Sequence, residues 1–96
     1  MTEPETRVIF RAFRDGGDVI AFFPDIEAEP GCCLSYMHTG QHGAANYHAL
    51  TAGPHPSRTP TRQAMPHEWA DLAAELGSIG YLLKVCRKWP SRRAAA

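Results

Sequence analysis

Histidine is the residue type in this chain best suited to chemistry, because all five histidines lie within residues 38–67. His38 and His42 are four positions apart, and Cys32 and Cys33 lie just upstream of them. Imidazole and thiolate groups are natural zinc ligands, so Cys33, His38 and His42 form an alternative metal-binding set. Most structural zinc sites begin with two cysteines that are separated by a few residues, which adjacent cysteines cannot provide. We therefore expect no bound metal and no cofactor.

The same histidines could act as general acids or bases, since imidazole titrates near neutral pH. A catalytic histidine needs a nucleophile or an orienting carboxylate nearby, and no carboxylate occurs between Glu29 and Glu68. The chain also lacks a G-x-S-x-G elbow, a phosphate-cradling glycine loop and a paired-carboxylate signature. The sequence favours a protein that is not an enzyme, with a histidine-centred, metal-dependent enzyme as the alternative.

Two further segments carry groups that could recognise a partner. Gly40 and Gly43 permit a tight loop, at which Gln41 and His42 would present an amide and an imidazole, although polar residues at a strand exit need no function. The C-terminal tail combines Trp89 with cations, as single-strand nucleic-acid binders do. These cations are Arg87, Lys88, Arg92 and Arg93. A formal net charge of zero argues against general phosphate binding, so nucleic-acid binding through the tail is a second alternative.

The elements that must position these residues begin with a hairpin. Residues 7–13 and 19–23 are rich in β-branched and aromatic residues, and the Asp-Gly-Gly between them favours a two-residue turn. Pro24 should end the second strand. Residues 33–38 and 81–86 read as further strands, and residues 66–76 as an amphipathic helix that starts at a proline. Residues 39–65 read as a long irregular loop, with a short strand or turn at 46–50 as an alternative. We expect an α+β domain with an antiparallel sheet of about four strands and one helix in the C-terminal half (β-β-β-loop-α-β).

Strand alternation divides the hairpin into two faces. The first face is wholly apolar and consists of Val8, Phe10, Ala12, Val19, Ala21 and Phe23. The second face consists of Ile9, Arg11, Phe13, Ile20 and Phe22. The helix should cover the first face and bury Phe10, Phe23, Trp69, Leu72, Leu76 and Val85 together. No second helix is expected to cover the other face, although residues 39–65 could cover some of it. We predict that part of this face forms a homodimer or partner interface, with Arg11 near its polar rim and with Gln41 and His42 as further contacts.

A chain of 96 residues has room for one domain, which we place at residues 7–88 between a flexible N-terminus (1–6) and a basic flexible tail (89–96). The polar, acidic N-terminus does not have the layout of a signal peptide, and no apolar run reaches membrane-spanning length. We expect a cytoplasmic protein that does not contact membranes. Three cysteines, two of them adjacent, favour reduced thiols.

Three segments carry a resemblance: DVIAFFPDI at residues 18–26, SYMHTGQHG at 35–43, and residues 68–85, which run from EW to IGYLLKV. Together they resemble a group of small α+β proteins of bacteria, phages and mobile elements, to which no activity is attached. The resemblance covers most of residues 7–88 and carries over no functional residue. It implies a phage or mobile-element gene. The resulting hypothesis is a small non-enzymatic protein-interaction module that inhibits a host protein, such as one of a CRISPR-type defence system.

Overall fold

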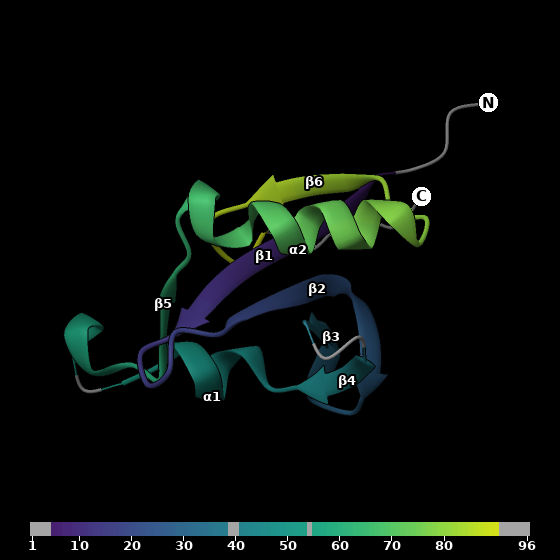
Figure 1. Ribbon diagram of the computed structural model, residues 1–96. Helices are drawn as coiled ribbons and strands as arrows, with labels where there is room; N and C mark the ends of the chain where they lie inside the picture. Colours follow the sequence, from purple (N-terminus) through teal and green to yellow (C-terminus); the bar gives the residue numbers. More distant parts are fainter. Residues whose placement is uncertain (1–4, 39–40, 54, 91–96) are drawn as a thin grey trace.

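The computed structural model describes residues 5–38, 41–53 and 55–90 and shows an α+β domain built on one sheet of six strands (Figure 1). The elements are β1 (Thr6–Phe13), β2 (Val19–Glu29), β3 (Cys32–Met37), β4 (Gln41–Ala45), α1 (Tyr47–Thr51), η1 (Pro56–Arg58), β5 (Thr61–Gln63), α2 (Pro66–Ser78) and β6 (Leu83–Cys86). The sheet runs in the order β4-β3-β2-β1, and β5 and β6 both pair with the outer edge of β1. All pairs are antiparallel except β1–β6, which is parallel. The α+β class is confirmed, whereas the predicted strand number was too low.

The predicted hairpin is confirmed as β1 and β2. Phe10 lies opposite Ala21, so the residues of the first face and those of the second face lie on opposite sides of the sheet as expected. The connection is longer than the predicted two-residue turn, and it closes with a hydrogen bond from the Phe13 N–H to the Asp18 carbonyl (2.8 Å). Gly16 and Gly17 have φ angles of +91° and +77°, a region that side chains rarely adopt.

The first face packs against α2, as the sequence predicted. Leu72 and Leu76 are fully buried with Phe10 and Phe23, and the Trp69 ring stacks on Phe10 at a centroid distance of 4.9 Å. The prediction for Val85 was wrong, because this side chain is 43% exposed. β6 lies at the edge of the sheet, and Leu83 rather than Val85 reaches the first-face core.

The start of α2 is held by a carboxylate. Glu68 accepts a hydrogen bond from the Met65 N–H (2.8 Å), as the third helical residue does in a capping box. The Arg62 guanidinium donates to both oxygens of Glu68, at 2.8 and 2.6 Å. These contacts, led by Arg62, lower the pKa of Glu68 to about 2. The helix therefore begins firmly at Pro66 and is tied to β5.

The second face is covered largely by residues 39–65, the alternative to an interface that the sequence left open. Ile9, Ile20 and Phe22 are buried and form a second core with Cys33 and Tyr47. Figure 1 shows the reason, since α1 and α2 lie on opposite sides of the sheet. Tyr47, the first residue of α1, places its ring edge-on to Phe22 at a centroid distance of 5.1 Å. The burial of Ile9, Ile20 and Phe22 removes these side chains from the interface predicted on this face, while Phe13 stays half-buried.

Residues 39–65, expected to be irregular, contain most of the missed structure: β4, α1, η1 and β5. Asn46 caps α1, because its side-chain oxygen accepts a hydrogen bond from the Ala49 N–H (3.0 Å). Thr61 in β5 is fully buried and donates its hydroxyl to the Leu50 carbonyl (2.6 Å), which ties β5 to α1. The segment thus supplies the cover of the second face.

β2 also continues past Pro24, where the sequence predicted its end. The register with β3 shifts between Phe23 and Glu27, so Pro24 lies in an irregularity where its missing N–H costs no ladder bond. The outer half of β2 therefore bends away from β1, at the right of Figure 1. This bend opens the space described next.

Candidate functional site: an aromatic groove beside the bend of β2

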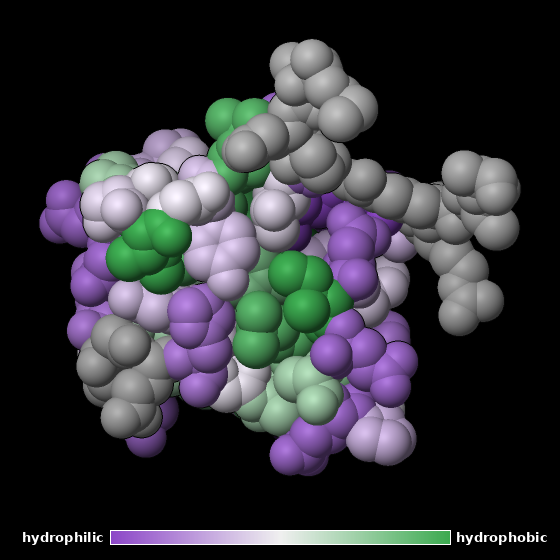
Figure 2. Space-filling model, turned by 90° about the vertical axis from the view of Figure 1, so that its right-hand side faces the viewer, coloured by the Kyte–Doolittle hydropathy of each residue, from purple (hydrophilic) through white to green (hydrophobic). Residues whose placement is uncertain are grey.

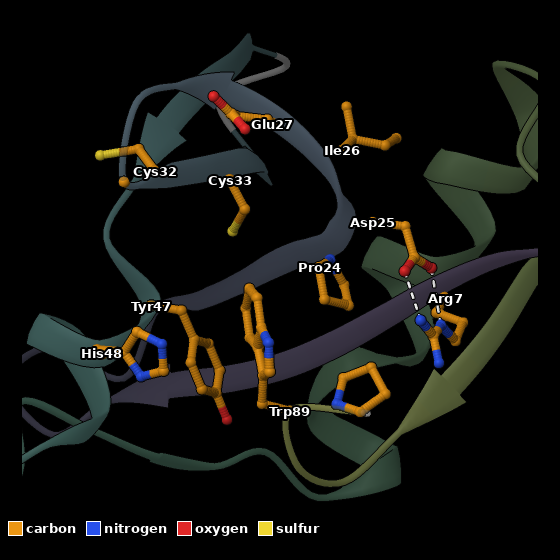
Figure 3. Close-up of a pocket in the computed structure, with 12 residues that line it drawn as sticks. Arg7, Pro24, Asp25, Ile26, Glu27, Cys32, Cys33, Tyr47, His48 and Trp89 are labelled. Atoms are coloured by element: carbon orange, nitrogen blue, oxygen red, sulfur yellow. Dashed lines mark hydrogen bonds and ion pairs between the residues drawn. The ribbon is translucent and has the colours of Figure 1, made fainter. Parts of the chain in front are cut away.

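A groove of about 580 Å³ lies between the bend of β2, the start of β3, the start of α1 and the segment after β6 (Figure 3). Its volume falls within the range of ordinary ligand sites. We call it the aromatic groove; its lining is Arg7, Pro24, Asp25, Ile26, Glu27, Gly31, Cys32, Cys33, Tyr47, His48, Trp89 and Pro90. The side of the molecule at which β2 bends also carries a hydrophobic patch surrounded by hydrophilic residues (Figure 2).

Three rings form one wall of the aromatic groove. The Trp89 ring contacts those of Tyr47 and His48 at centroid distances of 4.7 and 5.6 Å. Tyr47 is anchored from below by Phe22, and its burial raises the pKa of its hydroxyl. Trp89 itself stays 37% exposed. A firmly seated tyrosine therefore holds a tryptophan whose surface remains open to a ligand.

The opposite wall is acidic. Asp25 receives two hydrogen bonds from the Arg7 guanidinium, one of them from Nε at 2.7 Å, and this pairing raises the pKa of Arg7. The ion pair ties the bend of β2 to β1. Glu27 is exposed, and no hydrogen bond or ion pair joins its side chain to another described residue. Figure 3 shows Glu27 and Ile26 across the groove from Tyr47 and Trp89. The carboxylate of Glu27 thus lies on the wall opposite the rings.

The thiols of Cys32 and Cys33 complete the lining, and neither is bridged. Cys33 is only 6% exposed, and burial raises the pKa of its thiol. A neutral thiol is a poor nucleophile and a poor metal ligand. The buried Cys33 is therefore better suited to packing than to covalent chemistry.

The structure separates the residues of the alternative metal set. Cys33 packs in the second-face core, while His38 and His42 lie on the α2 side of the sheet. His38 Nδ1 lies 3.6 Å from a Glu75 carboxylate oxygen, and His42 Nε2 lies 2.9 Å from the Tyr81 hydroxyl. Strand alternation explains the separation of His42, because it pairs with Tyr36, which lies three positions from Cys33 and faces the other side of β3. Among residues 5–38, 41–53 and 55–90, no three His, Cys, Asp or Glu side chains are close enough to hold a metal.

None of the interaction residues predicted on the hairpin lines the aromatic groove. Ile9, Ile20 and Phe22 are buried, Phe13 is half-buried, and the half-buried Arg11 donates hydrogen bonds to Thr61. The predicted loop contacts also lie elsewhere. The backbone of Gln41 lies in β4, and the side chain of this residue is outside the described part. The side chain of His42 contacts the Tyr81 hydroxyl.

The basic tail divides into two parts. Arg87 and Lys88 are exposed beyond β6, whereas Arg92 and Arg93 lie outside the described residues. Trp89, which the sequence assigned to the tail, instead contacts α1. The packed domain therefore extends past residue 88.

Sequence reasoning missed the aromatic groove, although two signals pointed to it. Asp25, Glu27 and Glu29 alternate along one strand, which is typical of a solvated strand edge rather than of the loop we expected. Asn46 precedes Tyr47 as a helix cap. No local pattern joins these segments to Trp89, because their proximity depends on the path of the chain after β6.

The comparisons identify no similar protein: no family model, no curated protein and no solved structure matches this chain. In the part of the chain that the structure describes, no helix is long and apolar enough to cross a membrane.

Proposed function

We propose that the protein is a non-enzymatic protein-binding module, and that the aromatic groove takes an extended partner segment carrying a lysine or arginine side chain. The observation that carries this proposal is the position of the Glu27 carboxylate across the groove from the exposed ring of Trp89. This is the class of function that the sequence predicted, but the proposed binding site is the aromatic groove rather than the second face.

The chemistry of the groove supports a cationic occupant. Tryptophan is the most favourable ring for a cation–π contact, worth about 0.5–2 kcal/mol depending on desolvation. A lysine or arginine could lay its aliphatic stem along the Trp89 ring while its charge approaches Glu27. Asp25 is already neutralised by Arg7, so Glu27 is the acidic group that such a cation would meet. A groove with one uncompensated carboxylate and open aromatic surface favours cations over anions.

The phage or mobile-element setting, and inhibition of a host defence protein, remain predictions from the resemblance. Nucleic-acid binding through the tail also remains a prediction. The aromatic groove adds one specific feature to the proposed protein-binding function, namely that the partner presents a basic segment.

The proposal can be tested with three fluorescent decapeptides of one extended sequence that carry Lys, Glu or Gln at the central position. We expect the Lys peptide to bind most tightly and to shift the indole N–H resonance of Trp89 but not that of Trp69. Glu27→Lys should reverse the preference between the Lys and Glu peptides. Asp71→Lys is the matched control, because Asp71 is exposed on α2 and the charge change is the same. Equal binding of all three peptides, or an equal effect of the two variants, would overturn the proposal.

A further inference from the structure

A second hollow, of about 470 Å³, lies where the β1–β2 hairpin ends against β5 and the segment after α1. It shares no lining residue with the aromatic groove. The described residues that line it include three arginines and no acidic residue: Arg11, Arg14, Thr51, Ala52, Gly53, Thr59, Arg62 and Gln63. We call it the arginine hollow. Asp15 and Asp18, on the hairpin loop, are outside this lining.

A network of threonines positions two of the three guanidinium groups. Arg11 donates from Nη2 to the Thr61 carbonyl (2.7 Å) and from Nε to the Thr61 hydroxyl (3.1 Å). Arg14 approaches the Thr59 hydroxyl at 3.4 Å, and that hydroxyl in turn donates to the same Thr61 carbonyl. Thr59 and Thr61 are buried, so both arginines are anchored to one rigid point on β5. Guanidinium groups that are held in this way lose little freedom on binding a ligand.

None of the described residues that line the arginine hollow carries a negative charge. Arg62 is paired with Glu68 and contributes no net charge. Among the described residues, Arg11 donates to the neutral Thr61, and both its burial and the neighbouring charge of Arg14 lower its pKa. The guanidinium ions of Arg11 and Arg14 repel each other, and an anion bound between them would offset this repulsion.

We propose that the arginine hollow binds a phosphate dianion, either as free phosphate or as the terminal monoester of a small molecule. Guanidinium forks match the spacing of phosphate oxygens and can donate two parallel hydrogen bonds each. The bonds from Arg11 to Thr61 use two of its five N–H donors, which leaves donors for a ligand. Gln63 adds an amide at the rim. The proposal is independent of the aromatic groove and of the partner proposed for it.

The test is a titration of the full chain with inorganic phosphate, and separately with phenyl phosphate, at near-physiological potassium chloride. The readout is the arginine Nε–H resonances. We expect saturable shifts of Arg11 and Arg14 with a dissociation constant below about 1 mM, and Arg14→Gln should weaken binding about tenfold. Arg14→Lys, which keeps the charge but loses the fork, should also weaken it. Lys84→Gln is the matched control for charge, because Lys84 lies on β6 opposite Arg7, toward the other end of β1.

Each outcome of this titration decides something. Tighter binding of phenyl phosphate than of inorganic phosphate would indicate an organic monoester, and equal binding would indicate the free ion; both support the proposal. Absence of saturation at millimolar phosphate would overturn it, as would equal weakening by Arg14→Gln and Lys84→Gln. Binding of an oligothymidylate without 5′-phosphate, in the absence of phosphate binding, would show a phosphodiester surface instead and would also overturn it.

Discussion

Phe22 lies on the second face and is fully buried only because that face is covered. Phe22→Ala should therefore be strongly destabilising. The side chain is fully buried and lies edge-on to Tyr47. Truncation of a buried phenylalanine costs about 3–5 kcal/mol. A domain of this length has a free energy of unfolding of roughly 5–14 kcal/mol, so the variant should lose a large part of its stability. Urea denaturation followed by circular dichroism measures this loss directly.

Val85→Ala is the control for Phe22→Ala, because Val85 is an apolar residue of the same sheet that is 43% exposed. It should cost less than about 1 kcal/mol. The contact between the two rings can be isolated with a double-mutant cycle of Phe22→Leu and Tyr47→Leu, for which we expect a coupling of about 0.5–1.5 kcal/mol. If Phe22→Ala costs no more than Val85→Ala and the coupling is zero, α1 does not cover the second face and our account of this core is wrong.

Two further predictions concern α2. Leu76→Ala should cost about 2–5 kcal/mol in urea denaturation, because Leu76 is fully buried against the first face; a loss below about 0.5 kcal/mol would mean that the helix presents another side to the sheet. Glu68 has a pKa of about 2 in the folded protein, below the ordinary value of 4.5, so its contribution to stability is complete above pH 4.5 and is lost as the pH falls toward 2. The stability difference between wild type and Glu68→Gln should therefore shrink over that interval, and a difference that stays constant from pH 5 to about 2 would contradict the pairing with Arg62 and Met65.

The local sequence determined the hairpin, its two faces and α2. Alternation with a period of two assigned Phe10 and Phe22 to opposite faces whatever the length of the turn. A proline at the first helical position and the apolar stripe through Leu72 and Leu76 located the long helix. These signals are strong because each depends on neighbours within one or two turns of the chain.

Only the tertiary structure decided what covers the second face. α1 has five residues, too few to show helical periodicity, and it is held in place by the contact of Tyr47 with Phe22. β5 has three residues and depends on its pairing with β1. Such short elements have little intrinsic stability, so long-range packing rather than local preference selects them.

Local sequence patterns did not predict either candidate site. The aromatic groove joins β1, the bend of β2, the start of α1 and Trp89, and the arginine hollow joins β1 to β5 across about 50 positions of sequence. The residue types were visible in the sequence, but their proximity was not. The parallel return of β6 along β1 brings Trp89 onto Tyr47, and the burial of Thr61 brings Arg11 and Arg14 together. The sequence thus determined which side chains each strand presents to each face, while the closure of distant segments decided which of them meet.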